Sequence, residues 1–454
     1  MAGIPAGWAL SEGALGSDGN WMVNTNDVAS LSITSPAGYV GALLLQVSES
    51  WTDSNGVAHN VYVSDNVEAF AKGAPIFAWS GDDTLTASGG NDTLVFANQI
   101  GTDVVHNFDT VHDKIDLVGF NGFASFADVQ AHLGHDASGN AVITLADGET
   151  ITLNGVDAGS LNAGDFEFNA TPVTYNTGDM TIGDGALLPL SGIVENTGSI
   201  HLGSAGNETD LEIVQHGVTL DGGGTVVLSD NSENVIFGSD PSVTLTNVDN
   251  VISGAGQIGE GQMTLVNQGT IIADGSHALV IDTGVNTVIN SGTLESTGAG
   301  GLVVHSDLAN DGVLWANGGN VTLDGDVSGT GSALISGNAN LEVRGAFSEQ
   351  VQFDTGGSGT LTLDHSIDFK GILSGFGDHD SIDLGDILGA TASINYTANA
   401  AGTGGILTVN DGSHTANIAF TGQYATADFL VASDSTNHAL IQIEQHAHQV
   451  AAAA

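Results

Sequence analysis

The sequence predicts an all-β protein that combines a β-sandwich fragment, a short β-roll, a parallel β-solenoid (β-helix) and β-rich capping modules. Short apolar runs lie between clusters of Gly, Asn and Asp along the 454 residues, which is typical of many short strands. A Gly-x-Asp unit recurs soon after residue 80, and an Asn-x-Gly-x-(Ile/Leu) motif recurs further along. The predicted segments are the sandwich fragment at 1–73, the β-roll with its C-terminal module at 74–170, the solenoid at 171–365, and a second β-rich capping module with a tail at 366–454.

Residues 1–73 contain segments in which apolar and polar residues alternate, as in half-buried strands. These segments read WMVNT, ASLSITS, GALLLQVSESW and NVYVSD, and turns such as Asn55-Gly56 separate them. We interpret this region as part of a β-sandwich. We expect the chain to begin inside that domain, because little sequence precedes the first strand.

The stretch GDDTLTASGGNDTLVF opens the β-roll with a unit that fits calcium chemistry. Gly, Asp and an apolar residue recur in the same order three times. Calcium takes roughly six to eight oxygen ligands, glycine permits a left-handed loop that presents carbonyl oxygens, and aspartate adds a carboxylate. The predicted metal-site residues are Gly81, Asp83, Gly90, Asp92, Gly101 and Asp103.

Stacking of these units as half-coils would place Asp83 and Asp103 on the same side of the roll. The apolar residue two positions after each Asp would then point inward. The alternative is an ordinary meander in which the same residues only form turns.

The rest of the segment 74–170 contains one predicted helix, at 125–133. Ser125 is its expected N-cap, and Asp128 completes an expected capping box. Two strands, AVITL and TITLNGV, follow and are joined around Asp147-Gly148.

Residues 171–365 carry a motif with a period in the twenties, which is typical of stacked coils. The motif recurs after 71, 23 and 20 residues. We predict a parallel β-solenoid in which Val, Ile and Leu point inward, Gly and Asn form the turns, and stacked Asn side chains hydrogen-bond up the stack. Its copies are Asn196-Gly198-Ile200, Asn267-Gly269-Ile271, Asn290-Gly292-Leu294 and Asn310-Gly312-Leu314.

Residues 366–454 repeat the module that ends the β-roll. The stretch 375–384 matches 107–117, and 405–412 matches 141–148. Asp428-Phe429 likewise matches Asp165-Phe166. A duplicated element on both sides of a solenoid is expected to cap its ends.

Composition narrows the functional classes. The chain has 53 acidic and 4 basic residues, which give a net charge of −49. Nucleic acids and anionic membranes are bound through Lys and Arg, so we expect no nucleic-acid partner; we do expect affinity for cations. The N-terminus MAGIPAGWAL is no secretory signal peptide, and the longest apolar run, 40–45, is too short to insert in a membrane. The chain has no cysteine.

The roll and the stretch GTDVVHNFDTVHDKIDL resemble the end of an RTX β-roll, as in serralysin-type C-terminal domains of type I secreted proteins. The resemblance covers roughly residues 76–168. The stretch NVEAFAKGAPIFAWSGDD resembles the junction between cadherin-like adhesin repeats and such a roll, and the solenoid resembles regions of large bacterial surface proteins. The sequence departs from the full repeat, because Ala78-Trp79 and Ala87-Ser88 replace its leading Gly-Gly.

The resemblance implies a calcium-binding (Ca2+) protein outside the bacterial cell or on its surface. It also implies folding promoted by calcium after export, with the type I export machinery and a C-terminal export signal. An adhesin of this kind would contact an extracellular polysaccharide, a host surface or a matrix.

Enzyme motifs give no comparable signal. The stretch 254–259 fits the dinucleotide pattern GxGxxG, but we expect a strand after it rather than the helix that a pyrophosphate needs. The sequence has no HExxH, GxSxG or P-loop motif. We therefore expect no enzyme; the alternative is a carbohydrate-active solenoid, namely a polysaccharide hydrolase, lyase or epimerase. His446 and His448 are candidate metal ligands that we interpret as part of a tail.

Overall fold

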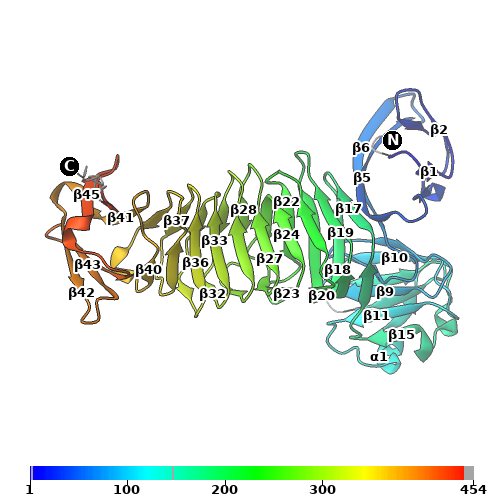
Figure 1. The fold of residues 1–454 in the computed structure, drawn as a ribbon. Helices are drawn as coiled ribbons and strands as arrows, with labels where there is room; N and C mark the ends of the chain where they lie inside the picture. The colour runs from blue at the N-terminus through cyan, green and yellow to red at the C-terminus, as the bar shows by residue number, and fades with distance from the viewer. Residues whose placement is uncertain (2–3, 146–147, 444–454) are drawn as a thin grey trace, which may run out of the picture. The chain divides into compact units, whose positions relative to one another are not determined.

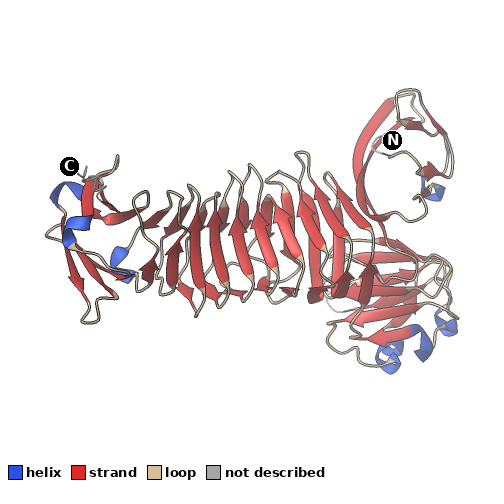
Figure 2. Cartoon of the chain, viewed as in Figure 1, coloured by secondary structure: helices blue, strands red, loops and turns tan. Residues whose placement is uncertain are grey.

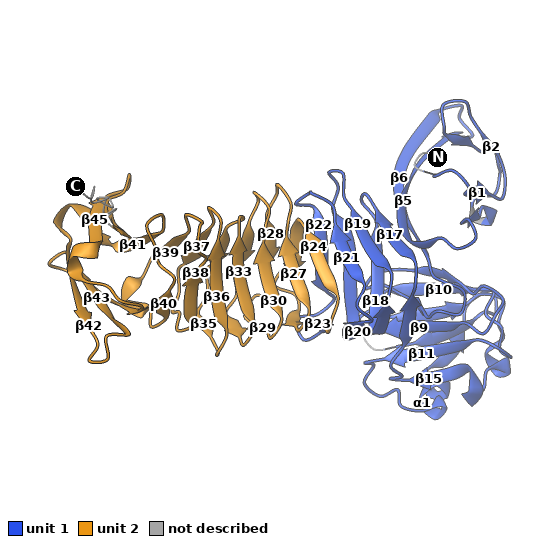
Figure 3. Cartoon of the chain, in the orientation of Figure 1, with its two compact units in different colours: residues 1–245 blue, residues 246–454 orange. Residues whose placement is uncertain are grey.

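The computed structural model describes residues 1, 4–145 and 148–443 and confirms the predicted all-β class. About 50% of the chain is strand and 5% is helix, and the strands build a parallel β-solenoid of about 15 turns (Figure 2). No helix in these residues is long and apolar enough to cross a membrane. The chain divides into two compact units, residues 1–245 and 246–454 (Figure 3). The predicted turn at Asp147 and the predicted tail ligands His446 and His448 lie outside the described residues.

The N-terminal part of the first unit is built around a long antiparallel hairpin. Strands β5 and β6 pair along their whole length, and β5 also pairs in parallel with the solenoid strand β17. Trp8, Leu43 and Leu45 form a small apolar core here. The strands are β1 (Ala9–Leu10), β2 (Ala14–Leu15), β3 (Trp21–Met22), β4 (Ile33–Thr34), β5 (Val40–Thr52) and β6 (Ala58–Ala69), with a 3₁₀ turn η1 (Val28–Ser30).

The β-roll has two sheets of short strands, one fully parallel and one with an antiparallel part, β12-β13-β14 (Figure 1). Both sheets contribute side chains to one apolar core. One sheet has the order β12-β13-β14-β10-β8 and the other β15-β11-β9-β7. Leu85, Leu94 and Val105 follow the three repeated aspartates by two positions and are buried, as predicted. The strands are β7 (Ile76–Phe77), β8 (Thr84–Thr86), β9 (Thr93–Ala97), β10 (Thr102–His106), β11 (Lys114–Val118), β12 (Leu133–His135), β13 (Ala141–Thr144), β14 (Thr150–Leu153) and β15 (Phe166–Phe168), with 3₁₀ turns η3 (Ala158–Ser160) and η4 (Ala163–Asp165).

The predicted helix is present as α1 (Phe126–Ala131), and Ser125 is its N-cap residue. The capping box is different from the prediction. The Ser125 hydroxyl donates a hydrogen bond to the Asp128 carboxylate at 2.7 Å, and the same carboxylate accepts the Ala124 N–H at 3.1 Å. The Ser125 side chain accepts no helix N–H, so the predicted capping box is not formed.

The solenoid strands of the first unit form two parallel stacks. One stack contains β16, β18, β20, β22 and β23, and the other contains β17, β19 and β21 beside the hairpin. The inward residues Ile182, Ile200 and Val226 are buried in the second of these stacks. The strands are β16 (Val173–Asn176), β17 (Asp179–Gly183), β18 (Leu187–Asn196), β19 (Ser199–Gly203), β20 (Thr209–Asp221), β21 (Thr225–Leu228), β22 (Asn234–Gly238) and β23 (Thr244–Asn247).

The second unit has the same pattern of parallel pairing, as the series β24, β27, β30 and β33 shows (Figure 3). The glycines of 254–259 lie in strands β24 and β25, and strand β26 follows them, so no helix N-terminus stands there, as predicted. The strands are β24 (Val251–Gly254), β25 (Gly256–Gly259), β26 (Thr264–Asn267), β27 (Thr270–Ala273), β28 (Leu279–Ile281), β29 (Val288–Asn290), β30 (Thr293–Ser296), β31 (Leu302–Val304), β32 (Leu308–Asn310), β33 (Val313–Asn317), β34 (Val321–Leu323), β35 (Val327–Ser328), β36 (Ser332–Ser336), β37 (Asn340–Val343), β38 (Gln350–Phe353), β39 (Thr360–Leu363), β40 (Ile372–Ser374) and β41 (Ser381–Leu388).

The asparagine of the repeated motif forms a buried ladder in the second unit. Each side-chain amide donates to the side-chain oxygen of the next asparagine, at 2.7–2.9 Å, from Asn247 through Asn267 and Asn290 to Asn310. Asn310 then donates to the Glu349 carboxylate at 2.7 Å. The ladder ends there, because an ionised carboxylate accepts hydrogen bonds but has no hydrogen to donate to a further residue. The predicted stacking of asparagine side chains is thus confirmed. Each bond of the ladder satisfies a side-chain amide that would otherwise be buried without a hydrogen-bond partner.

The glycine of the motif lies against the backbone of the previous coil. A Cβ at Gly198 would lie 2.1 Å from the carbonyl oxygen of Gly178, and one at Gly292 would lie 2.0 Å from that of Gly269. The Ile or Leu two positions later points into the core, where Leu294 aligns in register with Leu314. Each residue of the motif therefore has its own physical function. The Asn continues the ladder, the Gly lets two coils approach closely, and the Ile or Leu fills the core.

We expect Gly198→Ala to destabilise the first unit strongly and Gly178→Ala to leave it nearly unchanged. The methyl group added at position 198 would overlap a backbone oxygen that cannot move without separating two coils, whereas no atom lies within 4 Å of a Cβ at Gly178. Overpacking of this kind costs about 1–3 kcal/mol or more. Urea unfolding of the two variants side by side measures the difference, and equal midpoints would contradict the close approach.

The second capping module has the topology of the first, with one strand added. Strands β42, β43 and β44 form an antiparallel sheet, and β44 pairs in parallel with β40. In the first module β12, β13 and β14 likewise form an antiparallel sheet, and β14 pairs in parallel with β10. In the first module β11 pairs directly with β15, but in the second β46 lies between β41 and β45 and pairs with both. The strands are β42 (Ser393–Ala398), β43 (Gly404–Asn410), β44 (Thr415–Thr421), β45 (Phe429–Ser433) and β46 (His438–Ile443), with 3₁₀ turns η5 (Ser366–Asp368), η6 (Gly389–Thr391) and η7 (Thr426–Asp428).

Candidate metal site

The repeated aspartates of the β-roll lie on two different sides. Strands β8 and β10 pair with Val104 opposite Thr84, so Asp103 lies next to Asp83 on one side. Strands β9 and β11 pair with Lys114 opposite Thr93, which places Asp92 next to Asp113 on the other side. The structure thus brings Asp83 and Asp103 together as the half-coil arrangement predicted, and it separates them from Asp92.

The glycines of the three units have a different function from the one predicted. None of Gly81, Gly90 and Gly101 has a left-handed backbone; that conformation occurs at the neighbouring Gly89, with a φ of 80°. A Cβ at Gly101 would lie 2.2 Å from an Asp82 side-chain oxygen, and one at Gly81 would lie 2.4 Å from the Trp79 ring. These two positions therefore require glycine because neighbouring atoms approach closely, not because of handedness.

On the Asp92 side, protein donors satisfy the carboxylates. Asp92 accepts the Ser88 N–H at 2.6 Å and the Ser88 hydroxyl at 2.9 Å. Asp113 accepts the Asp92 N–H at 3.0 Å and the Asp109 N–H at 2.8 Å. Both aspartates are buried. Each of their carboxylate oxygens already has a donor, so the folded geometry of this side does not require a cation.

On the Asp83 side, one carboxylate oxygen has no partner. Asp83 accepts the Trp79 N–H at 2.8 Å, and its own N–H donates to Oδ1 of Asp103 at 2.9 Å. Asp103 is 0% exposed, and its Oδ2 has no hydrogen-bond partner among the residues that the structure describes. A buried ionised oxygen without a donor is costly, which points to a missing cation or a bound proton.

Distant elements add carboxylates to the same site. Glu212 of β20 is 0% exposed; its Oε2 accepts the Ser80 N–H at 3.4 Å, and its Oε1 has no partner. Asp82 accepts the Thr102 N–H at 2.7 Å. Glu68 of β6 also interacts electrostatically with Asp83. We call Glu68, Asp82, Asp83, Asp103 and Glu212 the acidic cluster; sequence reasoning missed the two glutamates because neither belongs to a motif.

Three carboxylates of the acidic cluster, those of Glu68, Asp83 and Asp103, have raised pKa values. Burial, followed by the charges of Asp103, Glu68 and Glu212, raises the pKa of Asp83 to about 8. Burial raises the pKa of Asp103 to about 7, with Asp82 and Glu149 adding to the shift, and burial also raises the pKa of Glu68 to about 7. Carboxylates with such raised pKa values release protons when a cation replaces them.

No lysine or arginine among the described residues forms an ion pair with Glu68, Asp83, Asp103 or Glu212. Lys114 of the same unit pairs with Glu167 instead. The donor set of the acidic cluster is therefore all oxygen, strongly negative and without an internal counter-ion. This is the chemistry that hard divalent cations such as calcium prefer.

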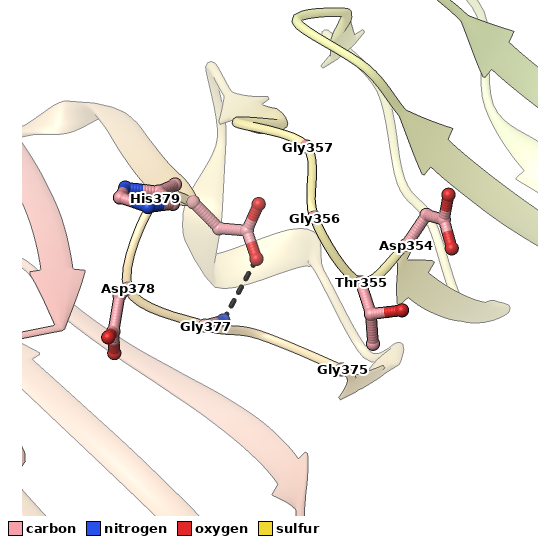
Figure 4. Close-up of a pocket in the computed structure, with 9 residues that line it drawn as sticks. Asp354, Thr355, Gly356, Gly357, Gly375, Gly377, Asp378 and His379 are labelled. Carbon is pink, nitrogen blue, oxygen red and sulfur yellow. Dashed lines mark hydrogen bonds between the residues drawn. The ribbon is translucent and has the colours of Figure 1, made fainter.

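A hollow of about 200 Å³ lies between two glycine-rich loops of the second unit (Figure 4). None of the described residues that line it has a buried side-chain oxygen without a hydrogen-bond partner. Asp354 and Asp378 line the hollow and are exposed. The buried Asp380 accepts the Gly377 N–H at 2.8 Å and the Gly359 N–H at 3.0 Å. Asp380 thus repeats the bonding of Asp113, its counterpart in the first module, and has no free oxygen to offer.

Comparison with known proteins gives no family for this chain. No family model matches it, and no curated protein matches it either. The function therefore has to be argued from the acidic cluster and the fold.

Proposed function

We propose that the chain is an extracellular calcium-binding module whose first unit is stabilised by a calcium ion at the acidic cluster. The observation that carries this proposal is the buried Asp103 Oδ2, which has no donor in a site where Glu212 offers a second such oxygen. The ligands would come from Asp83 and Asp103 of the roll, with Glu68 and Glu212 contributing from neighbouring elements. The predicted metal role of Asp92 is weaker, because its oxygens already accept hydrogen bonds.

The net charge of −49 supports coupling between calcium and folding. Repulsion among so many acidic groups opposes the compact state until cations reduce it. A ligand that binds only the folded state adds RT ln(1 + [L]/Kd) to stability, about 2.7 kcal/mol at a hundredfold excess over Kd. Such a chain would stay loosely folded where calcium is scarce and fold after export, where calcium is abundant.

The wider role that we propose is structural or adhesive, in a type I secreted or surface protein of a bacterium. The stacked coils offer a long repetitive surface, as in other solenoid proteins that bind extended partners. Binding to a panel of extracellular polysaccharides without new reducing ends would support an adhesin. Release of unsaturated uronates would instead indicate a carbohydrate-active enzyme.

We expect millimolar calcium to raise the melting temperature of the wild-type protein above its value in EDTA by several degrees. A stabilisation of about 2–3 kcal/mol shifts the melting temperature by roughly 4–12 °C in domains of this size. Asp103→Asn should lose most of that shift, because the variant keeps the Oδ1 acceptor for Asp83 but removes the unpartnered charge. Far-UV circular dichroism, which reports the β-sheet content, follows the transition.

The matched control is Asp179→Asn, which removes one charge from a side chain that is 80% exposed. This variant should keep the full calcium shift. In EDTA, Asp103→Asn should be at least as stable as the wild type, because it relieves repulsion in the acidic cluster. A calcium shift that persists in Asp103→Asn, or that is lost in Asp179→Asn, would exclude the acidic cluster as the site.

A further inference from the structure

The strand that distinguishes the two capping modules brings three metal-ligating side chains together. β46 lies between β41 and β45 in the second module, and its first residue is His438. The turn that joins β45 to β46 contains Asp434, and Asp383 lies on β41. One ligand atom of each of these three side chains lies within 4.8 Å of the other two.

Asp434 and His438 are held in place by the turn itself. Asp434 Oδ1 accepts the N–H groups of Thr436 at 2.9 Å and of His438 at 2.6 Å. The Thr436 hydroxyl lies 2.6 Å from Asp434 Oδ2 and 3.0 Å from Nδ1 of His438, so it connects the two side chains. Such contacts orient ligands before a metal binds, as the outer partners of histidine and carboxylate ligands do in metal sites.

Asp383 supplies an oxygen that no group among the described residues satisfies. Its Oδ1 is buried and has no hydrogen-bond partner. Burial raises its pKa, the carboxylates of Asp434 and Asp364 raise it further, and His438 lowers it. Arg344 reaches Asp364 at 3.7 Å but also pairs with Asp324 and Glu342, and it forms no ion pair with Asp383.

The first module provides an internal comparison. Asp116 is the counterpart of Asp383 in the duplicated stretch, and it too has a buried Oδ2 without a partner. Its Oδ1 accepts the Ala170 N–H at 3.3 Å, and no histidine belongs to a metal-ligating group there in the described residues. The module with the added strand is therefore the one that has gained both an imidazole and a second carboxylate.

We propose that Asp383, Asp434 and His438 bind a divalent first-row transition ion of the zinc class. Zinc is held by histidine nitrogen and aspartate oxygen, and three protein ligands leave a position for water. Calcium and magnesium take oxygen ligands, so the imidazole selects against them. This site is independent of the acidic cluster, which has no nitrogen ligand.

The test is a calorimetric titration of the full chain with Zn²⁺ in millimolar calcium. The absorption spectrum of the protein with Co²⁺ in place of Zn²⁺ reports which ligands bind the ion. We expect one zinc ion per chain at this site. His438→Ala should weaken binding by about 100-fold and change the Co²⁺ spectrum. Asp383→Asn should also weaken binding, and it should not lower the melting temperature in EDTA, because it removes a carboxylate whose buried Oδ1 has no hydrogen-bond partner among the described residues.

Two controls separate this site from other histidines and aspartates. Asp116→Asn removes the corresponding charge of the first module, and the double variant His446→Ala/His448→Ala removes the tail histidines. Both should bind zinc as the wild type does. Wild-type zinc affinity in His438→Ala, loss of zinc in the tail variant, or no zinc binding by the wild-type chain would overturn the proposal. If Asp383→Asn fails to fold, His438→Ala still tests the proposal, because the His438 side chain is partly exposed and its loss is expected to leave the fold intact.

Discussion

Replacing Asn290 with leucine is expected to destabilise the second unit by about 2–4 kcal/mol, one of the two largest effects that the fold predicts. Asn290 is 0% exposed and lies in the middle of the ladder. Its amide donates to Asn310 at 2.7 Å, and its oxygen accepts from Asn267 at 2.8 Å. Leucine fills a similar volume but leaves both neighbours with an unmade buried hydrogen bond.

Asn290→Asp should cost more, because the carboxylate can accept from Asn267 but cannot donate to Asn310. It would also place a charge in the ladder without a counter-ion. Asn395→Ala is the control: Asn395 is an exposed side chain whose hydrogen bond to Thr397 spans 3.2 Å. That variant should lie within about 0.5 kcal/mol of the wild type. Urea unfolding of all three variants measures the effect, and a leucine variant as stable as the control would contradict the ladder.

The second large effect is a loss of stability with rising pH when calcium is absent. The folded state raises the pKa of Asp83 to about 8 and the pKa values of Asp103, Glu68 and Glu349 to about 7, chiefly through burial. Their ordinary values are 3.8 for Asp and 4.5 for Glu, so between about pH 4.5 and 8 the folded state holds protons that the unfolded state has released. Stability is therefore greatest near the lower end of that range and falls as pH rises through it.

We expect the free energy of unfolding in EDTA to be lower at pH 8.5 than at pH 5 by a few kcal/mol, on the order of what several coupled and partly solvated groups can supply. Saturating calcium should remove most of the part that comes from the acidic cluster, because the cation compensates the ionised forms. The part due to Glu349 should remain, since this carboxylate lies at the end of the asparagine ladder.

The measurement is urea unfolding at pH 5, 6, 7 and 8.5, in EDTA and in calcium. Asp103→Asn should reduce the slope in EDTA, and Asp179→Asn should leave it unchanged. If the stability of the wild type in EDTA stays constant or rises over this pH range, these carboxylates are not buried without a counter-ion.

Much of the solenoid could be predicted because its signals are local and repeated. Each coil uses the same short motif, so the stacking of Asn290 could be predicted from the sequence spacing alone. Gly292 was predicted to form a turn, and only the structure shows that it lies against the backbone of Gly269. The match between the two capping modules was equally visible, and Asp113 and Asp380 indeed make the same hydrogen bonds. Because the same structural requirement acts at every copy of a repeat, the residues that meet it recur in the sequence and can be recognised.

The acidic cluster could be predicted only in part, because two of its five carboxylates come from segments outside the roll. Asp83 and Asp103 are marked by the repeat, but Glu68 and Glu212 occur in ordinary strands and reach the site only through the tertiary fold. The conformation of the glycines was also hidden: Gly101 fits a left-handed turn as well as it fits a close approach, and only the position of Asp82 distinguishes the two. The strand β46 has no counterpart in the first module, so the comparison of the two copies could not reveal it.

The most direct test of the central claim is a crystal structure of the calcium-loaded protein, with anomalous diffraction to locate the ions. The account predicts a calcium ion at the acidic cluster, within about 2.3–2.6 Å of carboxylate oxygens that include Asp103 Oδ2. It predicts none between Asp92 and Asp113, where protein donors already satisfy the oxygens. An empty acidic cluster, or calcium bound only on the Asp92 side, would contradict it.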